Sequence, residues 1–361
     1  MTGAAGENPD GAARALAGSM LGTAVGDALG LACEGLSARR QALLFPSLAR
    51  HGFLCGRGMI SDDTEHTVML AQSLIVAGGD ETRFARDFAW RLRGWLVALP
   101  AGIGMATLRA CAKLLIGIPP LRSGVVSAGN GPAMRAAVLG VACAGDVDLL
   151  KRLNRVAARI THRDPRAEEG ALVVALVARL AATVDRDIGT AEMVAKLAPH
   201  LVPDDAVWRA VAAAAASVIE EEPAADFVAR LGSRGGVSGF MLHTLPAVLH
   251  VWLRHQSDWR GGVEEIIRLG GDTDTTAAIL GGIIGARVGR AGIPAALVDT
   301  LIDWPRSPAM ILEVAARLAE ALRLGRPLPA VRSIVLAHPL RNLVFLAIVL
   351  AHGFRRLLPP Y

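Results

Sequence analysis

Glycine recurs at every fourth position in two apolar segments of this 361-residue chain. Residues 15–31 carry the first set, at Gly18, Gly22, Gly26 and Gly30, and the second set is Gly281, Gly285 and Gly289. Residues four apart lie on one face of an α-helix, so each segment presents a strip without side chains. Such strips let backbones approach closely. We therefore expect these two segments to form central, tightly packed helices. Packing of the two helices against each other is one such arrangement.

Apolar residues recur with a helical period along most of the remaining chain, punctuated by Pro, Gly and Asp. Clear alternating strands are absent from the pattern. The sequence predicts an all-α fold, a single compact orthogonal array of helices in one domain over residues 14–325, preceded by a disordered tail over residues 1–13. Further helices are expected at about 64–78, 81–98, 104–116, 132–144, 147–160, 168–184, 190–198, 205–220, 224–231, 239–255, 261–268, 275–290, 295–302 and 308–323.

Composition narrows the class of protein. Hydrophobic residues make up 52% of the chain and aromatic residues only 4%, which favours a tightly packed helical globule. The net charge of +5 comes from scattered arginines without a long basic run, so no specific nucleic-acid binding is expected. The four cysteines lack zinc-type spacing, and we expect them to be reduced and buried. The first thirteen residues do not read as a signal peptide, which favours a cytoplasmic location.

Two acidic motifs lie about two hundred residues apart, Ser61-Asp62-Asp63-Thr64 and Asp272-Thr273-Asp274-Thr275. Their four carboxylates would balance two divalent cations, and hard oxygen ligands favour magnesium or manganese. Paired metals of this kind polarise oxygens around a bond that is being broken. The alternative is that both motifs are ordinary helix N-caps, with Glu65 completing a capping box in the first. Capping needs one side chain, however, and stacked acids repel unless positive charge lies between them.

Several segments together resemble the ADP-ribosylglycohydrolases, with the dinitrogenase reductase-activating members as the closest comparison. The resemblance covers roughly residues 15 to 320 and follows the family's motif order. It rests on Gly22-Thr23-Ala24-Val25-Gly26-Asp27-Ala28-Leu29-Gly30 with Glu34, on Ser61–Thr64, on Gly129–Arg135, on Thr161–Pro165 and on Gly270–Thr276.

The resemblance implies the same all-helical architecture and a role for each matching residue. Phe240 stands where the family often has tyrosine, so the aromatic ring is kept and the hydroxyl is lost. The implied metal ligands are Ser61, Asp62, Asp63, Asp272, Asp274 and Thr275. The implied catalytic carboxylates are Asp62, Asp63 and Glu34. The implied substrate contacts are Gly129, Asn130, Gly131, His162 and Phe240.

The activity implied by the resemblance is hydrolysis of the N-glycosidic bond between ADP-ribose and a modified protein side chain. Arginine is the expected acceptor, an ADP-ribosylated protein the expected partner, and two Mg²⁺ or Mn²⁺ ions the expected cofactors. The residues leave other acceptors open, including O-linked or nucleic-acid-linked ADP-ribose and a free small molecule. A non-catalytic module of the same fold that binds ADP-ribose or a partner is a further alternative.

Residues 333–361 differ from the rest of the chain. Leu343 through Ala351 are almost wholly apolar, and Arg355 and Arg356 follow. An uninterrupted run of about ten residues is short of the ~20 needed to cross a bilayer. We expect a helix docked on the core or on a partner protein. Membrane association, as an interfacial helix or a short insertion, is the alternative.

Overall fold

The computed structural model describes residues 9–359 apart from 54, 234 and 335. The described residues form α-helices, short 3-10 turns and isolated β-bridges, with no β-sheet among them. This confirms the predicted all-α class. The α-helices are α1 Pro9–Gly30, α2 Ala38–Leu44, α3 Asp62–Ala77, α4 Glu81–Val97, α5 Met105–Leu115, α6 Pro120–Ser123, α7 Ala136–Ala142, α8 Val147–Arg159, α9 Pro165–Thr183, α10 Thr190–Leu197, α11 Ala206–Ile219, α12 Ala224–Arg230, α13 Met241–Arg254, α14 Trp259–Arg268, α15 Thr273–Val288, α16 Ala295–Asp299, α17 Pro308–Leu324 and α18 Ala337–Arg355.

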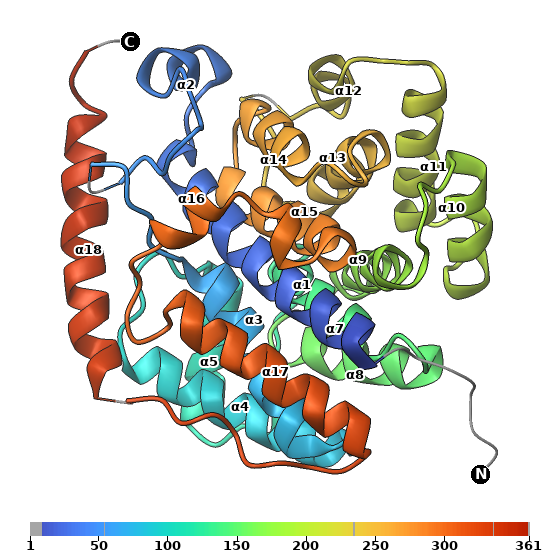
Figure 1. Ribbon diagram of the computed structural model, residues 1–361, viewed down its shortest axis with the longest axis vertical. Coiled ribbons are helices and arrows are strands. Elements are labelled where there is room, and N and C mark those ends of the chain that lie inside the picture. The colour runs from blue at the N-terminus through green and yellow to red at the C-terminus, as the bar shows by residue number, and fades with distance from the viewer. Residues whose placement is uncertain (1–8, 54, 234, 335, 360–361) are drawn as a thin grey trace.

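The glycine strips of α1 and α15 pack against each other at the centre of the molecule (Figure 1). A Cβ placed on Gly22 would lie 2.1 Å from the carbonyl oxygen of Gly281, and one on Gly18 would lie 2.1 Å from that of Gly285. Each step of four residues forward along α1 is matched by a step of four backward along α15, so the helices are antiparallel. The expected contact between the two strips is confirmed.

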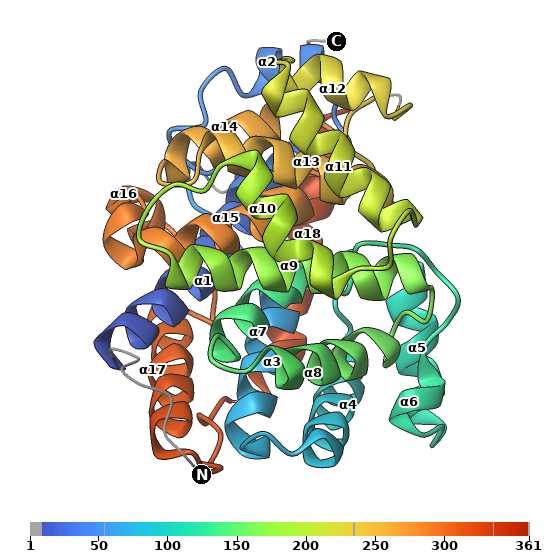
Figure 2. The same cartoon turned by 90° about the vertical axis from the view of Figure 1, so that its right-hand side faces the viewer.

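The remaining helices surround this pair (Figures 1 and 2). On one side α3 and α17 pack against α1, and on another α7 and α9 cover both central helices. Helices α13 and α14 contact α15, and α11 packs on α13 at the periphery. Because α1 and α15 are covered all round, both are buried along nearly their whole length and carry little amphipathic pattern.

Several sequence-based boundaries need correction. Helix α1 begins at Pro9, so residues 9–13, predicted as part of a disordered tail, are helical, whereas residues 1–8 lie outside those described. Asp10 in the first turn and the alanines after it favour this earlier start. The short helices α2 and α6 were not expected, and the helix predicted over 132–144 divides into a 3-10 turn and α7.

All four cysteines are free, as expected, but only three of them are buried. Cys55 is exposed, in a turn where its φ of 58° is left-handed. The prediction that every cysteine lies in the core is therefore wrong for Cys55. It sits in the long connection between α2 and α3, where the chain folds over the surface.

Helix α18 lies along one edge of the molecule (Figure 1). Its inner side carries Phe345, which packs with Leu31, Ala32, Phe53 and Met59 in a small second apolar cluster. Among the described residues, two helices are long and apolar enough to cross a membrane by length and composition: α1, whose apolar window is 94% buried, and α18, whose window is only 22% buried. The expectation of a docked helix at 333–361 therefore fits its inner side, whereas its outer side is uncovered.

Replacing Gly22 by alanine should destabilise the protein, because the new methyl would overlap the backbone of Gly281. Overpacking at a site that cannot relax costs at least about 1–3 kcal/mol of unfolding free energy. The matched control is Gly94→Ala in α4, where an added Cβ meets nothing within 4 Å. That substitution should be neutral or stabilising by about 0.5–1 kcal/mol, since alanine favours a helix interior. Denaturant unfolding of both variants measures the difference, and equal stabilities would contradict the packing argument.

Candidate active site

The antiparallel contact of the central helices places the second acidic motif beside the end of α1. The Thr273 hydroxyl, in the first turn of α15, donates to the Gly30 carbonyl at 2.8 Å. Immediately after α1, the Gly35 amide donates to the Gly271 carbonyl at 2.8 Å. A Cβ on Gly30 would lie 2.2 Å from the Thr273 carbonyl oxygen. The loop that carries Glu34 is therefore fixed against the start of α15.

Asp27 fixes the first acidic motif to the same helix. Its carboxylate accepts hydrogen bonds from the Ser61 amide at 2.9 and 3.0 Å and from the Thr64 amide at 3.2 Å. It also accepts a hydrogen bond from the Thr64 hydroxyl. These donors lie in the first turn of α3, where amides have no partner within the helix. Asp27 on α1 thus serves as the cap of α3 and determines where Asp62 and Asp63 stand.

The two motifs meet at Asp63. The Thr275 hydroxyl of the second motif donates to Asp63 Oδ2 at 3.3 Å, and the Ser61 hydroxyl donates to the same oxygen at 2.9 Å. The other oxygen of Asp63 is buried without a hydrogen-bond partner, and so is Oδ1 of Asp274. Buried carboxylate oxygens are costly when they are left unpaired. Two such oxygens in one acidic cluster point to a cation as the missing partner.

Burial and mutual repulsion raise the pKa values of these acids. Burial, together with the charges of Asp27 and Glu65, holds the pKa of Asp62 well above its usual range. The pKa of Asp63 is raised well above its usual range by burial and by Asp27 and Asp62, and that of Asp274 by burial and by Glu34. Burial raises the pKa of Asp27 to about 6. The cluster is therefore short of positive charge.

A hollow of about 610 Å³ opens above the acidic cluster, a size typical of small-molecule sites. Its walls come from the loop after α1, the start of α3, residues 102–107 at the start of α5, the segment 127–134, residues 233 and 235–239, and the start of α15. The predicted site residues that line it are Glu34, Asp62, Gly129, Asn130, Gly131, His162, Asp272, Asp274 and Thr275. Ser61 and Asp63 lie directly behind this lining, bonded to it through Thr275.

The glycines at 129 and 131 make room for the His162 ring. A Cβ on Gly131 would lie 2.8 Å from Cε1 of His162, and one on Gly129 would lie 3.3 Å from Nε2. Between them, the Asn130 amide group donates to Asp272 Oδ2 at 2.7 Å and to the Thr244 hydroxyl at 3.0 Å. Burial, helped by Arg135, lowers the pKa of His162 to about 3, so its ring is neutral at neutral pH.

Phe240 is not brought into the hollow. Its ring lies edge-on to His243, with centroids 5.2 Å apart, and under the guanidinium of Arg166 at 5.5 Å. Its backbone forms a bridge with Gly129, so it supports the wall of the hollow from behind. The substrate contact that the resemblance implies for Phe240 would require its ring to turn.

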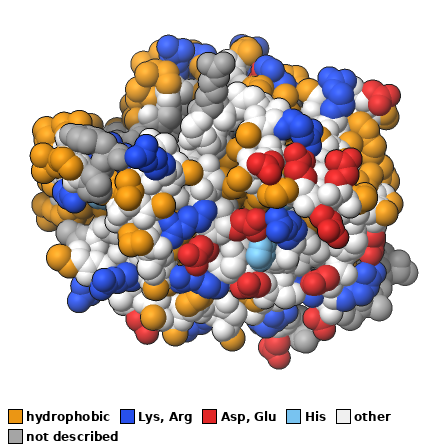
Figure 3. All heavy atoms as spheres, turned by 90° about the horizontal axis from the view of Figure 1, so that it is seen from above, with side chains coloured by type: hydrophobic (Ala, Val, Ile, Leu, Met, Phe, Trp, Pro, Cys, Tyr) orange, Lys and Arg blue, Asp and Glu red, His pale blue; other side chains and the backbone are white. Residues whose placement is uncertain are grey.

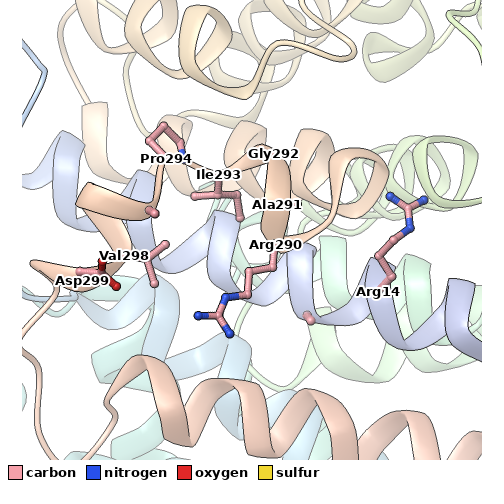
Figure 4. A pocket seen from close by; sticks show the side chains of 10 residues that line it. Arg14, Arg290, Ala291, Gly292, Ile293, Pro294, Val298 and Asp299 are labelled. Atoms are coloured by element: carbon pink, nitrogen blue, oxygen red, sulfur yellow. The ribbon is translucent and has the colours of Figure 1, made fainter.

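A second hollow of about 630 Å³ lies at the opposite ends of α1 and α15, lined by Arg14, Arg290, Ile293, Pro294 and Asp299 among others (Figure 4). It contains one acidic residue and neither acidic motif. A site for divalent cations requires several carboxylates close together, and the acidic hollow has them. The acidic hollow is therefore the candidate active site.

Helix α18 reaches the rim of the acidic hollow. The Arg356 guanidinium donates to the carbonyl oxygens of Glu34 at 2.6 Å and Ala32 at 2.7 Å, and His352 Nε2 lies 3.0 Å from the Ala32 oxygen. The Glu34 side chain itself is exposed at the rim. Partial loss of solvent, followed by the charge of Asp272, raises the pKa of Glu34, and Arg356 opposes this shift.

The donors present suit divalent metal ions. Carboxylate and hydroxyl oxygens are the ligands that Mg²⁺ and Mn²⁺ prefer. Within the described part of the chain, no three Asp, Glu, His or Cys side chains already form a metal cage, so the set depends on hydroxyls and on turning of carboxylates. One oxygen of Asp63 and one of Asp274 have no hydrogen-bond partner, so these two oxygens are available to bind an ion. Asp62, Asp63, Asp272 and Asp274, with Ser61 and Thr275, would hold the ions.

The sequence left open whether Asp27 supports the acidic site or caps a turn, and it gave no sign of the partners of Asn130, Glu65 and Arg356. The one usable signal was Asp27 itself, a charged residue within an otherwise apolar helix. Glu65 is not part of a capping box. It is buried, with Arg306 at 2.5 Å and Arg341 at 3.5 Å, and these two arginines overcome burial to hold its pKa below the usual value.

Comparison with known proteins defines the class. The family profile described as ADP-ribosylglycohydrolase matches residues 8–327, so the chain belongs to the ADP-ribosylglycohydrolase family. It is accordingly a hydrolase that acts on ADP-ribosyl groups. The matched region contains both acidic motifs and ends before α18.

Individual relatives agree with this assignment. The chain is 27% identical to the ADP-ribosyl-[dinitrogen reductase] glycohydrolase of Rhodospirillum rubrum, over 79% of this chain and 89% of that protein. It is 26% identical to ADP-ribosylhydrolase ARH3 of Gallus gallus, over 77% and 86% respectively, and 31% identical to an uncharacterised protein of Archaeoglobus fulgidus, over 74% and 86%. A solved structure titled ADP-ribosylglycohydrolase-related protein complex superposes with a TM-score of 0.64 at 28% identity, covering 86% of this chain and 99% of that one.

Metal-free protein should lose stability as the pH rises. The raised pKa values of Asp27, Asp62, Asp63 and Asp274 mean that the folded state binds protons more tightly than the unfolded state. This stabilisation is complete below the usual pKa of aspartate and is lost as the pH rises through about 6 and above. An ion bound by these acids would replace the protons, so Mn²⁺ should raise the melting temperature more above about pH 7 than near pH 5. Equal shifts at both pH values would contradict an ion bound by these acids.

Loss of the Arg356 side chain should loosen the Glu34 loop. In Arg356→Ala, amides of residues 31–36 should exchange hydrogen faster, because two hydrogen bonds to that loop are lost. Arg355→Ala is the matched control, since Arg355 is exposed and donates to the Pro359 carbonyl instead, at 3.0 Å. Hydrogen exchange followed by mass spectrometry distinguishes the two variants. Unchanged exchange in Arg356→Ala would show that the loop is held by other contacts.

Proposed function

We propose that the protein hydrolyses the N-glycosidic bond between ADP-ribose and a modified arginine side chain, using two Mg²⁺ or Mn²⁺ ions. The observation that carries this proposal is the meeting of the two acidic motifs at Asp63. There, carboxylates from α3 and α15 are buried together, with one oxygen each on Asp63 and Asp274 left without a partner. A paired-metal site is the arrangement that would satisfy both features at once.

Charge balance supports two ions. The four aspartates of the motifs would carry four negative charges when ionised, which two divalent cations neutralise. When bound, the ions would hold the adjacent hydroxyls of the distal ribose and polarise its anomeric region. Thr275 and Ser61 bond to Asp63 and leave Asp62 as the acid of the first motif that lines the hollow.

Cleavage of the glycosidic bond requires a carboxylate that takes a proton from the attacking water. Asp62 and Glu34 are the candidates that line the hollow, whereas Asp63 lies behind it. A raised pKa makes a carboxylate a stronger base, and the pKa of Glu34 is raised by burial and by the charge of Asp272. Glu34 stands at the rim, where the leaving side chain would pass, and Asp62 stands at the floor.

The walls offer neutral contacts for the rest of ADP-ribose. Gly129, Asn130 and Gly131 present backbone at close range, and the neutral His162 ring can exchange one hydrogen bond with the ligand. Glu34 adds a fifth acidic side chain that two ions would leave unbalanced. An excess of negative charge favours a cationic acceptor, and a modified guanidinium stays positively charged. This excess is the reason for preferring arginine over an O-linked or nucleic-acid-linked acceptor.

The purified protein should release ADP-ribose from an ADP-ribosylated arginine peptide when Mg²⁺ or Mn²⁺ is present, and chelator should abolish the release. The Asp274→Ala variant should lose activity by about a hundredfold or more, because an ion ligand and its charge are removed together. Chromatographic detection of free ADP-ribose is the measurement.

Asp299→Ala is the matched control, because it removes an acid from the other hollow and should leave turnover unchanged. An ADP-ribosylated serine peptide, tested in parallel, reports the acceptor. Release from serine alone would refute the arginine assignment while keeping the hydrolase. Chelator-sensitive binding of ADP-ribose without any release would favour a binding module instead.

A further inference from the structure

The outward face of α18 is apolar along its whole length. Its large side chains are between 42% and 88% exposed, although the helix is docked on the protein. The hydrophobic side chains gather at the left edge of Figure 3, where α18 lies in Figure 1. Exposed patches of this extent mark interaction sites. The exposed apolar residues are Leu336, Leu340, Leu343, Val344, Leu346, Ala347, Leu350, Ala351, Phe354, Leu357 and Leu358.

The exposed arc is too wide for one partner helix. At 3.6 residues per turn, these positions span about 160° of the helix circumference. A helix that packs on one neighbour needs an apolar stripe of only about 100°, and a coiled-coil seam is narrower still. An extended apolar medium covers the wider arc. A bilayer surface does so when a helix lies along it with its apolar side sunk into the boundary between headgroups and acyl chains.

The charges around α18 favour an anionic surface. After Glu320 the sequence contains no acidic residue and six arginines. Of these, Arg332 and Arg355 are exposed just before the helix and at its end, and no charge interrupts the apolar arc between them. Two copies of the chain paired through α18 would bring these arginines together without an acid to offset them. Anionic lipid headgroups supply the opposite charge.

The inner side of α18 keeps the helix on the protein, so it lies along a membrane and does not cross it. Arg341 forms a buried ion pair with Asp303, Asn342 donates to the Ala98 carbonyl at 2.7 Å, and Arg356 donates to the Ala32 carbonyl at 2.7 Å. A crossing helix would lose all three contacts. Separating a buried ion pair leaves an uncompensated charge, and an arginine within the hydrocarbon region is costly.

We propose that the outer face of α18 binds the surface of an anionic lipid bilayer while its inner face stays docked. Leu99, which follows the Ala98 contact and is 69% exposed, is an exposed apolar side chain beside the helix. Trp304, next to Asp303 and 51% exposed, adds a residue type that settles at membrane interfaces. The inference is independent of the proposed catalytic activity, because it concerns another surface and its readout needs no turnover.

The test is co-sedimentation of the full chain with vesicles of phosphatidylcholine alone and of phosphatidylcholine mixed with phosphatidylglycerol. Binding is expected to the mixed vesicles and to weaken with added salt. The double variant Leu343→Glu/Leu350→Glu should lose it. The control, Val202→Glu/Ile219→Glu, alters side chains that are 54% and 68% exposed around α11, across the molecule from α18, and should bind like the original chain (Figure 1). Arg355→Gln should weaken binding about fivefold.

Three results would overturn the proposal. The first is no binding to mixed vesicles by the original chain. The second is binding that survives Leu343→Glu/Leu350→Glu while circular dichroism shows that variant folded. The third is a dimer, seen by light scattering without lipid, that Leu343→Glu/Leu350→Glu abolishes while vesicle binding is absent; this would assign the face to a second copy of the chain.

Discussion

Direct backbone contact between α1 and α15 is the constraint on which the rest of the molecule depends. Glycine faces carbonyl at successive turns of both helices, and there is no space between them for a single methyl group at these positions. The contact fixes one end of α15 against the end of α1, and Asp27 on α1 then fixes the start of α3. Two motifs separated by 212 residues at the Thr275–Asp63 hydrogen bond are thereby held on one rigid frame.

The buried acids at the start of α3 differ in whether an arginine neutralises their charge. Glu65 is neutralised by the guanidinium groups of Arg306 and Arg341, so its pKa stays below the usual value. Asp62 and Asp63, in the same first turn of α3, form no ion pair with an arginine among the described residues, and their pKa values rise. The contrast distinguishes a charge that is neutralised within the fold from charges that are not. A carboxylate paired with arginine is complete, whereas one that lacks a cation retains affinity for an ion.

The sequence was informative where a local pattern repeats and uninformative where distant side chains meet. The spacing of the glycines predicted the central helix pair, and the two acidic motifs supplied the acids Asp62, Asp272 and Asp274 and the hydroxyl of Thr275 in the lining of the hollow. Local spacing did not predict three of the interactions. These are the Asn130–Asp272 hydrogen bond, the ion pairs of buried Glu65 with two arginines, and the hydrogen bonds of Arg356 to the Glu34 loop. Each joins segments from different parts of the chain, and only the folded packing selects such partners. Phe240 lies outside the lining of the hollow for a related reason, since its ring packs against Arg166 and His243.

The period of the glycine strips also limits how the molecule can move. Shifting α1 along α15 by one, two or three residues would drive side chains into backbone, so the next permitted register is four residues, about 6 Å, away. A slide of that size would pull Thr275 away from Asp63 and dismantle the floor of the hollow. The central helices therefore cannot adapt to different ligands by gliding past each other. Any adjustment of shape must come from other parts of the wall, at residues 102–107 and 235–239, while the floor stays rigid beneath them.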